Sequence, residues 1–152
     1  MLSVRETDVL DMARLLTASK FFTSFSIGKK LGKGGFGSVF SVIEKRTNQA
    51  YALKCIQKAD IRSGKVVFVE NEIEIGKLRL NHENILTYID SFEVGYTVCV
   101  LMEKMDGDLC RYFDIVHRHE KLPEWEVSHI TRQLLSALQY LERMKIVHRD
   151  VS

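Results

Sequence analysis

The alternation of apolar and polar residues divides the chain into a strand-rich first part and a helix-rich second part. Apolar, β-prone stretches flank a glycine cluster within residues 25–43, and another such stretch, QAYALKCI, covers residues 49–56. Two further strand candidates, ILTYIDSFE (85–93) and YTVCVLME (96–103), are joined by a turn at Val94–Gly95. The first three of these strands, separated by turn residues, predict an antiparallel meander.

Helical periodicity replaces the strand pattern in two places. Residues from about 66 to 80 have a charged, helix-favouring composition, and residues 122–144 form a longer helical segment. Pro123, Glu124 and Glu126 are expected in the first turn of the longer helix, because N–H groups there lack helical partners and the dipole favours acids. An apolar stripe follows at helical spacing: Val127, Ile130, Leu134, Leu138 and Leu141. Strands first and helices after predict an α+β fold.

The composition adds few constraints. The chain has 152 residues, the length of one ordinary domain. Its 22 basic and 20 acidic residues give a net charge of only +2, which offers no argument for a nucleic-acid partner or an acidic membrane surface. Cys55, Cys99 and Cys110 are far apart in the sequence and lack metal-ligand spacing. They indicate free thiols in a reducing, cytoplasmic compartment.

The first 24 residues form a separate extension. Charged residues such as Arg5, Asp8 and Arg14 interrupt its apolar positions, which argues against a secretory signal, and no apolar run in the chain is long enough to span a bilayer. The spacing of its apolar residues predicts a short amphipathic helix. Packing on the domain, or a loosely held extension, is favoured over a membrane anchor.

The segment Gly32–Gly37 fits the pattern G-x-G-x-x-G. Alone, this pattern is equally compatible with a flexible hairpin tip. A dinucleotide-binding site needs such glycines to open a helix, whereas here Ser38–Ile43 predicts a strand. A glycine-rich hairpin followed by a strand resembles the arrangement of protein kinases, in which such a hairpin folds over phosphates. Its backbone N–H groups can approach the phosphate oxygens because no side chain obstructs them.

Lys54 lies on the strand that follows this hairpin. A lone lysine on a strand is usually solvated, but after a glycine hairpin it is expected to hold the α- and β-phosphates as a point charge. Ala52 is small enough for an adenine ring to lie against its strand. A carboxylate partner for Lys54 can come from the helix that contains Glu70, Glu72 and Glu74.

Four motifs occur in a fixed order: GKGGFGSV, YALK, the NEI helix and HRD. In this order they resemble the eukaryotic protein kinase superfamily, over roughly residues 25–152. The resemblance implies a five-stranded antiparallel N-lobe (about 25–105) with one regulatory helix. The first helices of a C-lobe (about 106–152) follow, and the extension (1–24) lies outside.

The resemblance also implies a site for ATP with Mg²⁺, acting on a protein hydroxyl. Asp150 would accept or orient the proton of that hydroxyl, and Lys54 and Glu72 would form the supporting ion pair. Met102 would border the back of the adenine pocket. The implied ATP contacts are Leu31, Gly32, Lys33, Gly34, Gly35, Phe36, Gly37, Ser38, Val39, Ala52, Lys54, Met102, Glu103 and Met105.

The choice of the paired acid stays open. The residues around Glu72 resemble the family's sequence around the paired acid. With Glu72 as the partner, however, Gly76 lies one turn later, where a bulky apolar residue is expected. Glu74 would put Leu78 there, but it leaves the helix one residue short. Glu72 is preferred.

Two departures from the family pattern limit the expected activity. Ser152 stands where Ser/Thr kinases usually carry lysine, so the hydroxyl specificity is open, with Ser/Thr favoured. The residues that bind magnesium in the family lie beyond Ser152, so these 152 residues alone are expected to bind ATP poorly and turn over little. A non-catalytic nucleotide-binding or interaction module, similar to a pseudokinase, is the alternative.

Overall fold

The computed structural model describes residues 21–34, 37–57, 74–118, 121–148 and 151, which belong to two compact units. One unit contains the residues up to Arg79 together with Thr87–Lys104. The other contains Leu80–Leu86 together with the residues from Met105 onward. The helix predicted within residues 1–20 lies outside the described residues. None of the helices described is long and apolar enough to cross a membrane.

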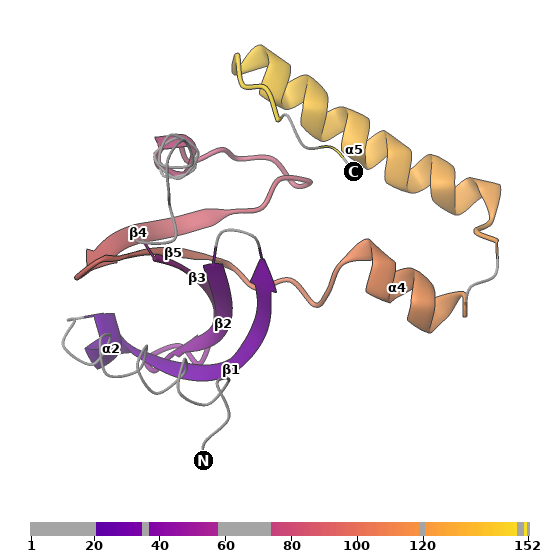
Figure 1. Ribbon diagram of the computed structural model, residues 1–152. Coiled ribbons are helices and arrows are strands. Elements are labelled where there is room, and N and C mark those ends of the chain that lie inside the picture. Colours follow the sequence, from indigo (N-terminus) through magenta and orange to yellow (C-terminus); the bar gives the residue numbers. More distant parts are fainter. Residues whose placement is uncertain (1–20, 35–36, 58–73, 119–120, 149–150, 152) are drawn as a thin grey trace. The chain divides into compact units, whose positions relative to one another are not determined.

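The first unit is a five-stranded antiparallel sheet, as predicted. Its strands follow the order β1-β2-β3-β5-β4 (Figure 1). Their bounds are β1 Phe25–Gly34, β2 Gly37–Glu44, β3 Ala50–Gln57, β4 Tyr88–Val94 and β5 Thr97–Glu103. The turn between β4 and β5 lies one residue later than predicted. Val94 pairs with Thr97, and Gly95 takes a φ of 57°, a left-handed conformation that glycine adopts without steric cost.

One face of this sheet carries the hydrophobic core. Six buried side chains form it: Phe40, Val42, Leu53, Cys55, Cys99 and Leu101. The short helix α2 (Phe21–Ser24) lies against the same core, where the Phe21 ring stacks on Phe25 at 4.2 Å and on Phe92 at 4.5 Å between centroids. The last residues of the predicted extension therefore pack on the sheet.

Two of the three free cysteines meet in this core. Cys55 and Cys99 are directly opposite each other on β3 and β5, with their sulfur atoms 3.8 Å apart, whereas Cys110 is exposed. The hydrogen bond with Cys99 and the burial of the thiol raise the pKa of Cys55, so this thiol stays protonated. Strand pairing places close together two residues that are 44 positions apart in the sequence.

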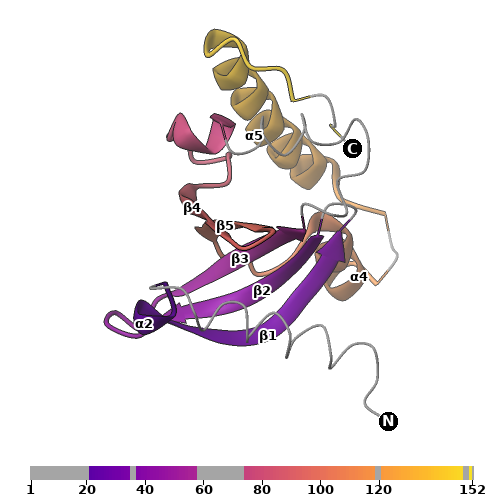
Figure 2. The same ribbon diagram turned by 60° about the vertical axis from the view of Figure 1, so that its left-hand side comes forward.

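The second unit is built from α4 (Leu109–Val116) and α5 (Glu124–Arg143), both visible in Figure 2. Asp108 caps α4, since its carboxylate accepts a hydrogen bond from the Arg111 N–H at 2.7 Å. The prediction for Pro123 was wrong by one position, because Pro123 precedes α5 in an extended conformation and Glu124 is the first helical residue. The Pro123 carbonyl accepts a hydrogen bond from the N–H of Glu126 at 3.0 Å, so Pro123 contributes to the first turn of α5 although it precedes the helix.

The segment before β4 runs along α5. The Asn81 N–H donates to the Tyr140 hydroxyl at 3.2 Å, and a His82 ring nitrogen lies 3.1 Å from the Ser136 hydroxyl. Ile85 belongs to a turn in this segment, with its N–H bonded to the His82 carbonyl, so β4 starts three residues later than predicted. These contacts hold Leu80–Leu86 within the second unit.

The apolar stripe of α5 is buried only in part. Leu141 is buried, with 7% of its surface exposed, as is Ala137. By contrast, Val127 and Leu134 are each 44% exposed. The contacts within the second unit therefore cover the C-terminal half of the stripe.

A buried carboxylate joins α4 to α5. The Tyr112 hydroxyl donates to Glu126 Oε1 at 2.6 Å, and His117 Nε2 lies 2.9 Å from Glu126 Oε2. The Tyr112 hydrogen bond, aided by the adjacent His117 and opposed by burial, lowers the pKa of Glu126 below its ordinary value. Glu126 thus stays ionised although it is buried, because its neighbours compensate for the lost hydration.

Candidate functional site

The glycine motif forms the hairpin between β1 and β2. Gly34 pairs with Gly37 at its end, and Gly35 and Phe36, which complete the predicted phosphate loop, lie outside the described residues. Leu31 and Lys33 are exposed on β1. A side chain at Gly32 would meet no atom within 4 Å, so the space beside this part of the hairpin is open.

Gly37 anchors the hairpin against β3. Its φ is 151°, and a Cβ atom at this position would overlap the carbonyl oxygen of Cys55. Only glycine allows this approach of β2 to β3. Gly37 thereby fixes the start of β2 against Cys55 and Ile56.

Gly37→Ala is expected to destabilise the protein by about 2–4 kcal/mol, because it adds both backbone strain and overlap with the β3 backbone. Urea unfolding followed by circular dichroism measures this. Gly32→Ala is the matched control and should change stability by less than about 1 kcal/mol, since the space beside it is open. Equal stability losses for the two variants would contradict this role of Gly37.

Strand register places four of the predicted nucleotide contacts, Val39, Ala52, Lys54 and Met102, on one face of the sheet, whereas Ser38 lies opposite Cys55 and belongs to the other face. Lys54 on β3 lies directly opposite Val39 on β2 and Val100 on β5. In the neighbouring row, Ala52 lies opposite Ser41 and Met102. Residues that face each other across antiparallel strands share a side of the sheet, and successive residues alternate.

This surface, which we call the Lys54 face, is opposite the hydrophobic core. It combines small or apolar side chains with one cation: Ala52 and Met102 are 6% and 8% exposed, and Lys54 and Val39 are half-buried. The alternate residues, such as Leu53 and Cys55, point into the core. Apolar side chains beside a cation can hold a planar ring next to an anionic group.

The end of β5 has a structural role that the sequence did not reveal. The Glu103 carboxylate accepts a hydrogen bond from the Thr87 N–H at 2.6 Å, and the Glu103 N–H donates to the Thr87 carbonyl at 3.0 Å. Glu103 therefore fixes the residue that precedes β4. Met105 follows in the second unit and is 60% exposed.

Neither Glu72 nor Asp150 is among the described residues, so their predicted roles stay predictions. Of the segment predicted to form this helix, residues 74–77 are described, and they are helical. Glu74 is exposed there and makes an ion pair with Lys77 at 2.6 Å.

Gly76 and Tyr88 make a contact that the sequence did not predict. A Cβ atom at Gly76 would lie 2.9 Å from Cδ1 of the Tyr88 ring on β4. The ring therefore occupies the space beside the helix where a larger residue was expected. The sequence shows a small residue on the helix and a large one on β4, but not that these two residues are neighbours. The contact could therefore not be predicted from the sequence.

Comparison with known proteins agrees with this arrangement. The family model described as "Protein kinase domain" matches residues 25–152. The chain is 39% identical over 121 residues to the serine/threonine-protein kinase TIO of Arabidopsis thaliana, which covers 80% of this chain and 9% of that protein. It is 36% identical over 128 residues to the serine/threonine-protein kinase DCLK1 of Rattus norvegicus, covering 84% and 28% of the two chains.

A third relative, the serine/threonine-protein kinase DCLK2 of Homo sapiens, is 34% identical over 139 residues, which cover 91% of this chain and 18% of that protein. The chain thus spans between 9% and 28% of the length of these three relatives. The family model covers most of the chain, and the described sheet has the strand number and pairing that the motifs predicted. The chain therefore belongs to the protein kinase domain family.

Proposed function

We propose that this protein binds ATP on the Lys54 face and transfers its γ-phosphate to a serine or threonine hydroxyl of a protein substrate. The single observation that carries the proposal is the register that aligns Val39, Lys54 and Val100 beside Ala52 and Met102. ATP supplies the phosphoryl group and this chain supplies binding and orientation. The serine/threonine-protein kinases among the relatives support the class of hydroxyl.

Each part of the Lys54 face suits a part of ATP. Ala52 leaves room for the adenine ring, and Lys54 offers a cation to the α- and β-phosphates. The open space beside Gly32 lets the hairpin backbone approach the phosphates. The described residues contain no cluster of three or more acidic, histidine or cysteine side chains that could hold magnesium.

The family organisation supports a division of the chain into an extension (1–24), an N-lobe (about 25–105) and part of a C-lobe (about 106–152). The change of unit between Lys104 and Met105 favours the lobe boundary, although Leu80–Leu86 join the second unit. Cytoplasmic location stays a prediction from the sparse cysteines.

The phase of the helix favours Glu72 over Glu74 as the partner of Lys54. Gly76 faces Tyr88, and a residue four positions earlier lies on the same side of a helix. In the helix predicted over residues 66–80, that residue is Glu72. Glu74 instead pairs with the exposed Lys77, and Leu78, one turn after Glu74, is 53% exposed.

Glu72→Gln is expected to weaken Mg·ATP binding severalfold, because Lys54 loses the carboxylate that positions it. Glu74→Gln, which makes the same chemical change two residues away, should leave the affinity unchanged. The dissociation constants come from NMR titration of the 152-residue chain. The reverse ranking of the two variants would assign the pair to Glu74, and no saturable binding by the unmodified chain would contradict the proposed function.

A further inference from the structure

Cys55 and Cys99 form a dithiol in the core of the sheet. The two residues face each other directly across β3 and β5, and their sulfur atoms are 3.8 Å apart. Both are free cysteines, and they are 1% and 0% exposed. Both belong to the core face, so neither takes part in the nucleotide site proposed on the Lys54 face.

The strand pairing meets the main geometric requirement for a disulfide bond. Residues directly opposite each other on antiparallel strands have Cα atoms about 4.5–5.5 Å apart, and disulfide bonds span Cα separations of about 4.4–6.8 Å. The neighbouring pairs Lys54–Val100 and Ile56–Val98 hold the register on both sides. Bringing the two sulfur atoms into bonding distance therefore requires side-chain rotation with little movement of the backbone.

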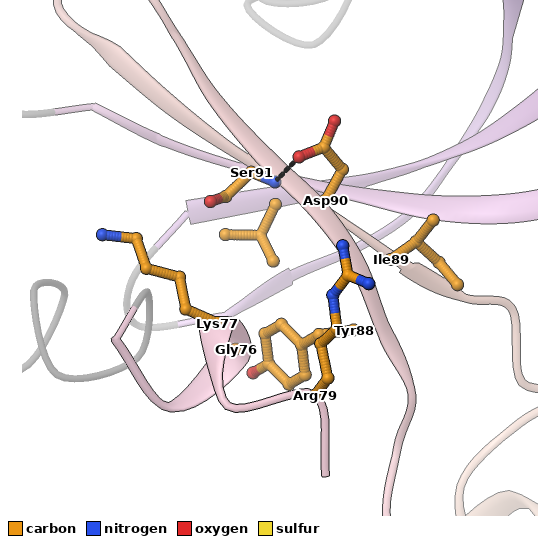
Figure 3. Close-up of a pocket in the computed structure, with 8 residues that line it drawn as sticks. Gly76, Lys77, Arg79, Tyr88, Ile89, Asp90 and Ser91 are labelled. Atoms are coloured by element: carbon orange, nitrogen blue, oxygen red, sulfur yellow. Dashed lines mark hydrogen bonds between the residues drawn. The ribbon is translucent and has the colours of Figure 1, made fainter. Parts of the chain in front are cut away.

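Burial determines when such a bond can form. The hydrogen bond with Cys99 and the burial of the thiol raise the pKa of Cys55, and only a thiolate attacks a disulfide. The pocket beside β4 in Figure 3 gives no access to the pair, because its wall includes Val100, and Val100 and Cys99 point to opposite faces of β5. Oxidation therefore requires a transient separation of β3 from β5, and the closed sheet then protects the product from small reductants.

We propose that Cys55 and Cys99 are a redox modification site, at which a low-molecular-weight disulfide converts the pair to a buried disulfide bond. Reducing conditions keep the pair as thiols, so the bond forms when the pool of small thiols becomes oxidised. The inference does not depend on nucleotide binding, so it is tested separately from the proposed function.

Two successive exchange steps form the bond. The thiolate of one cysteine attacks the small disulfide, which gives a mixed disulfide and releases one small thiolate. The thiolate of the other cysteine then attacks the protein sulfur of the mixed disulfide, which forms the bond between Cys55 and Cys99 and releases the second small thiolate. The protein sulfurs lose two electrons to the small disulfide, and the two protons of the cysteines end on the two small thiols.

The bond is expected to stabilise the first unit. It joins residues that are 44 positions apart, and a cross-link of this span restricts the unfolded chain. Oxidation should therefore raise the urea midpoint, followed by circular dichroism, by about 1–2 M. Unfolding the oxidised chain in the presence of dithiothreitol should restore the original midpoint.

The test is incubation of the 152-residue chain with oxidised glutathione, followed by intact-mass measurement. We expect the mass to fall by that of two hydrogen atoms, and non-reducing peptide mapping should join the peptides of Cys55 and Cys99. Urea at a concentration below the unfolding transition should accelerate the reaction about tenfold, because it lowers the free energy of opening.

Single-cysteine variants identify the partners. Cys110→Ser, which removes the exposed thiol, should keep both the loss of mass and the rise in urea midpoint. Cys55→Ala and Cys99→Ala should each lose both effects, and peptide mapping of the unmodified chain decides the question if these variants do not fold. A bond to Cys110, a stable glutathione adduct, an unchanged mass, or no acceleration by urea would each overturn the proposal.

Discussion

Replacing Lys54 with methionine is expected to weaken Mg·ATP binding by about 10- to 100-fold. This loss corresponds to the binding free energy that charge-assisted hydrogen bonds from an ammonium group to a phosphate contribute. Methionine keeps the length and apolar stem of the side chain, so the sheet should stay intact. Lys54 lies between Val39 and Val100 in the middle of the proposed nucleotide surface. Titration of the 152-residue chain at millimolar nucleotide measures the loss.

Lys29→Met is the control for this experiment, because Lys29 is exposed on β1. It removes the same charge from the first unit and should change the affinity by less than about twofold. If both lysine variants weakened binding equally, general charge attraction would explain the affinity. If neither did, Lys54 would have no part in holding the phosphates, and the non-catalytic interaction module would become the better description.

Leu53→Ala is expected to destabilise the protein by about 2–5 kcal/mol, because it leaves a cavity in the core. Leu53 is fully buried and lies opposite Phe40 and Leu101 on the neighbouring strands. The loss is a large part of the roughly 5–15 kcal/mol that holds an ordinary domain together. Urea unfolding followed by near- and far-ultraviolet circular dichroism measures it.

Leu78→Ala makes the same truncation at a residue that is 53% exposed, and should cost less than about 1 kcal/mol. A small effect at Leu53 would mean that the core opposite the Lys54 face is not tightly packed. The two leucines thus test burial with the chemical change held constant.

The pattern of the sequence predicted the strands of the sheet. Ala52 and Lys54 are two residues apart, so they had to share a face of any strand, and Leu53 had to point the other way. The five-stranded antiparallel sheet was expected from the family resemblance, and the position of β5 between β3 and β4 was not predicted. Small errors occurred where a turn depended on one hydrogen bond, as at Ile85, or on one glycine, as at Gly95.

Contacts between distant segments could not be predicted. Tyr88 fills the space beside Gly76 because β4 returns next to the helix, which no local pattern specifies. The link between Tyr112 and Glu126 likewise depends on how α4 meets α5. Periodicity assigns a residue to a face, but partners across segments depend on packing in three dimensions.

The family motifs assigned roles to site residues that local sequence patterns could not assign. Without this context, Lys54 would be interpreted as a solvent-exposed residue on a strand. Its predicted role in binding phosphates came from its position after the glycine hairpin. Its neighbours across the strands, Val39 and Val100, required the pairing register. Glu72 and Asp150 rest on the resemblance and on the tests proposed for them.

The most direct test of the central claim is methyl NMR of the 152-residue chain during titration with Mg·ATP. The Lys54 face carries methyl groups on Val39, Ala52 and Met102, and the core face carries them on Val42, Leu53 and Leu101. The account predicts saturable shifts for the first three residues and little change for the second three. Shifts that are larger on the core face, or no saturable shift on the Lys54 face, would contradict it.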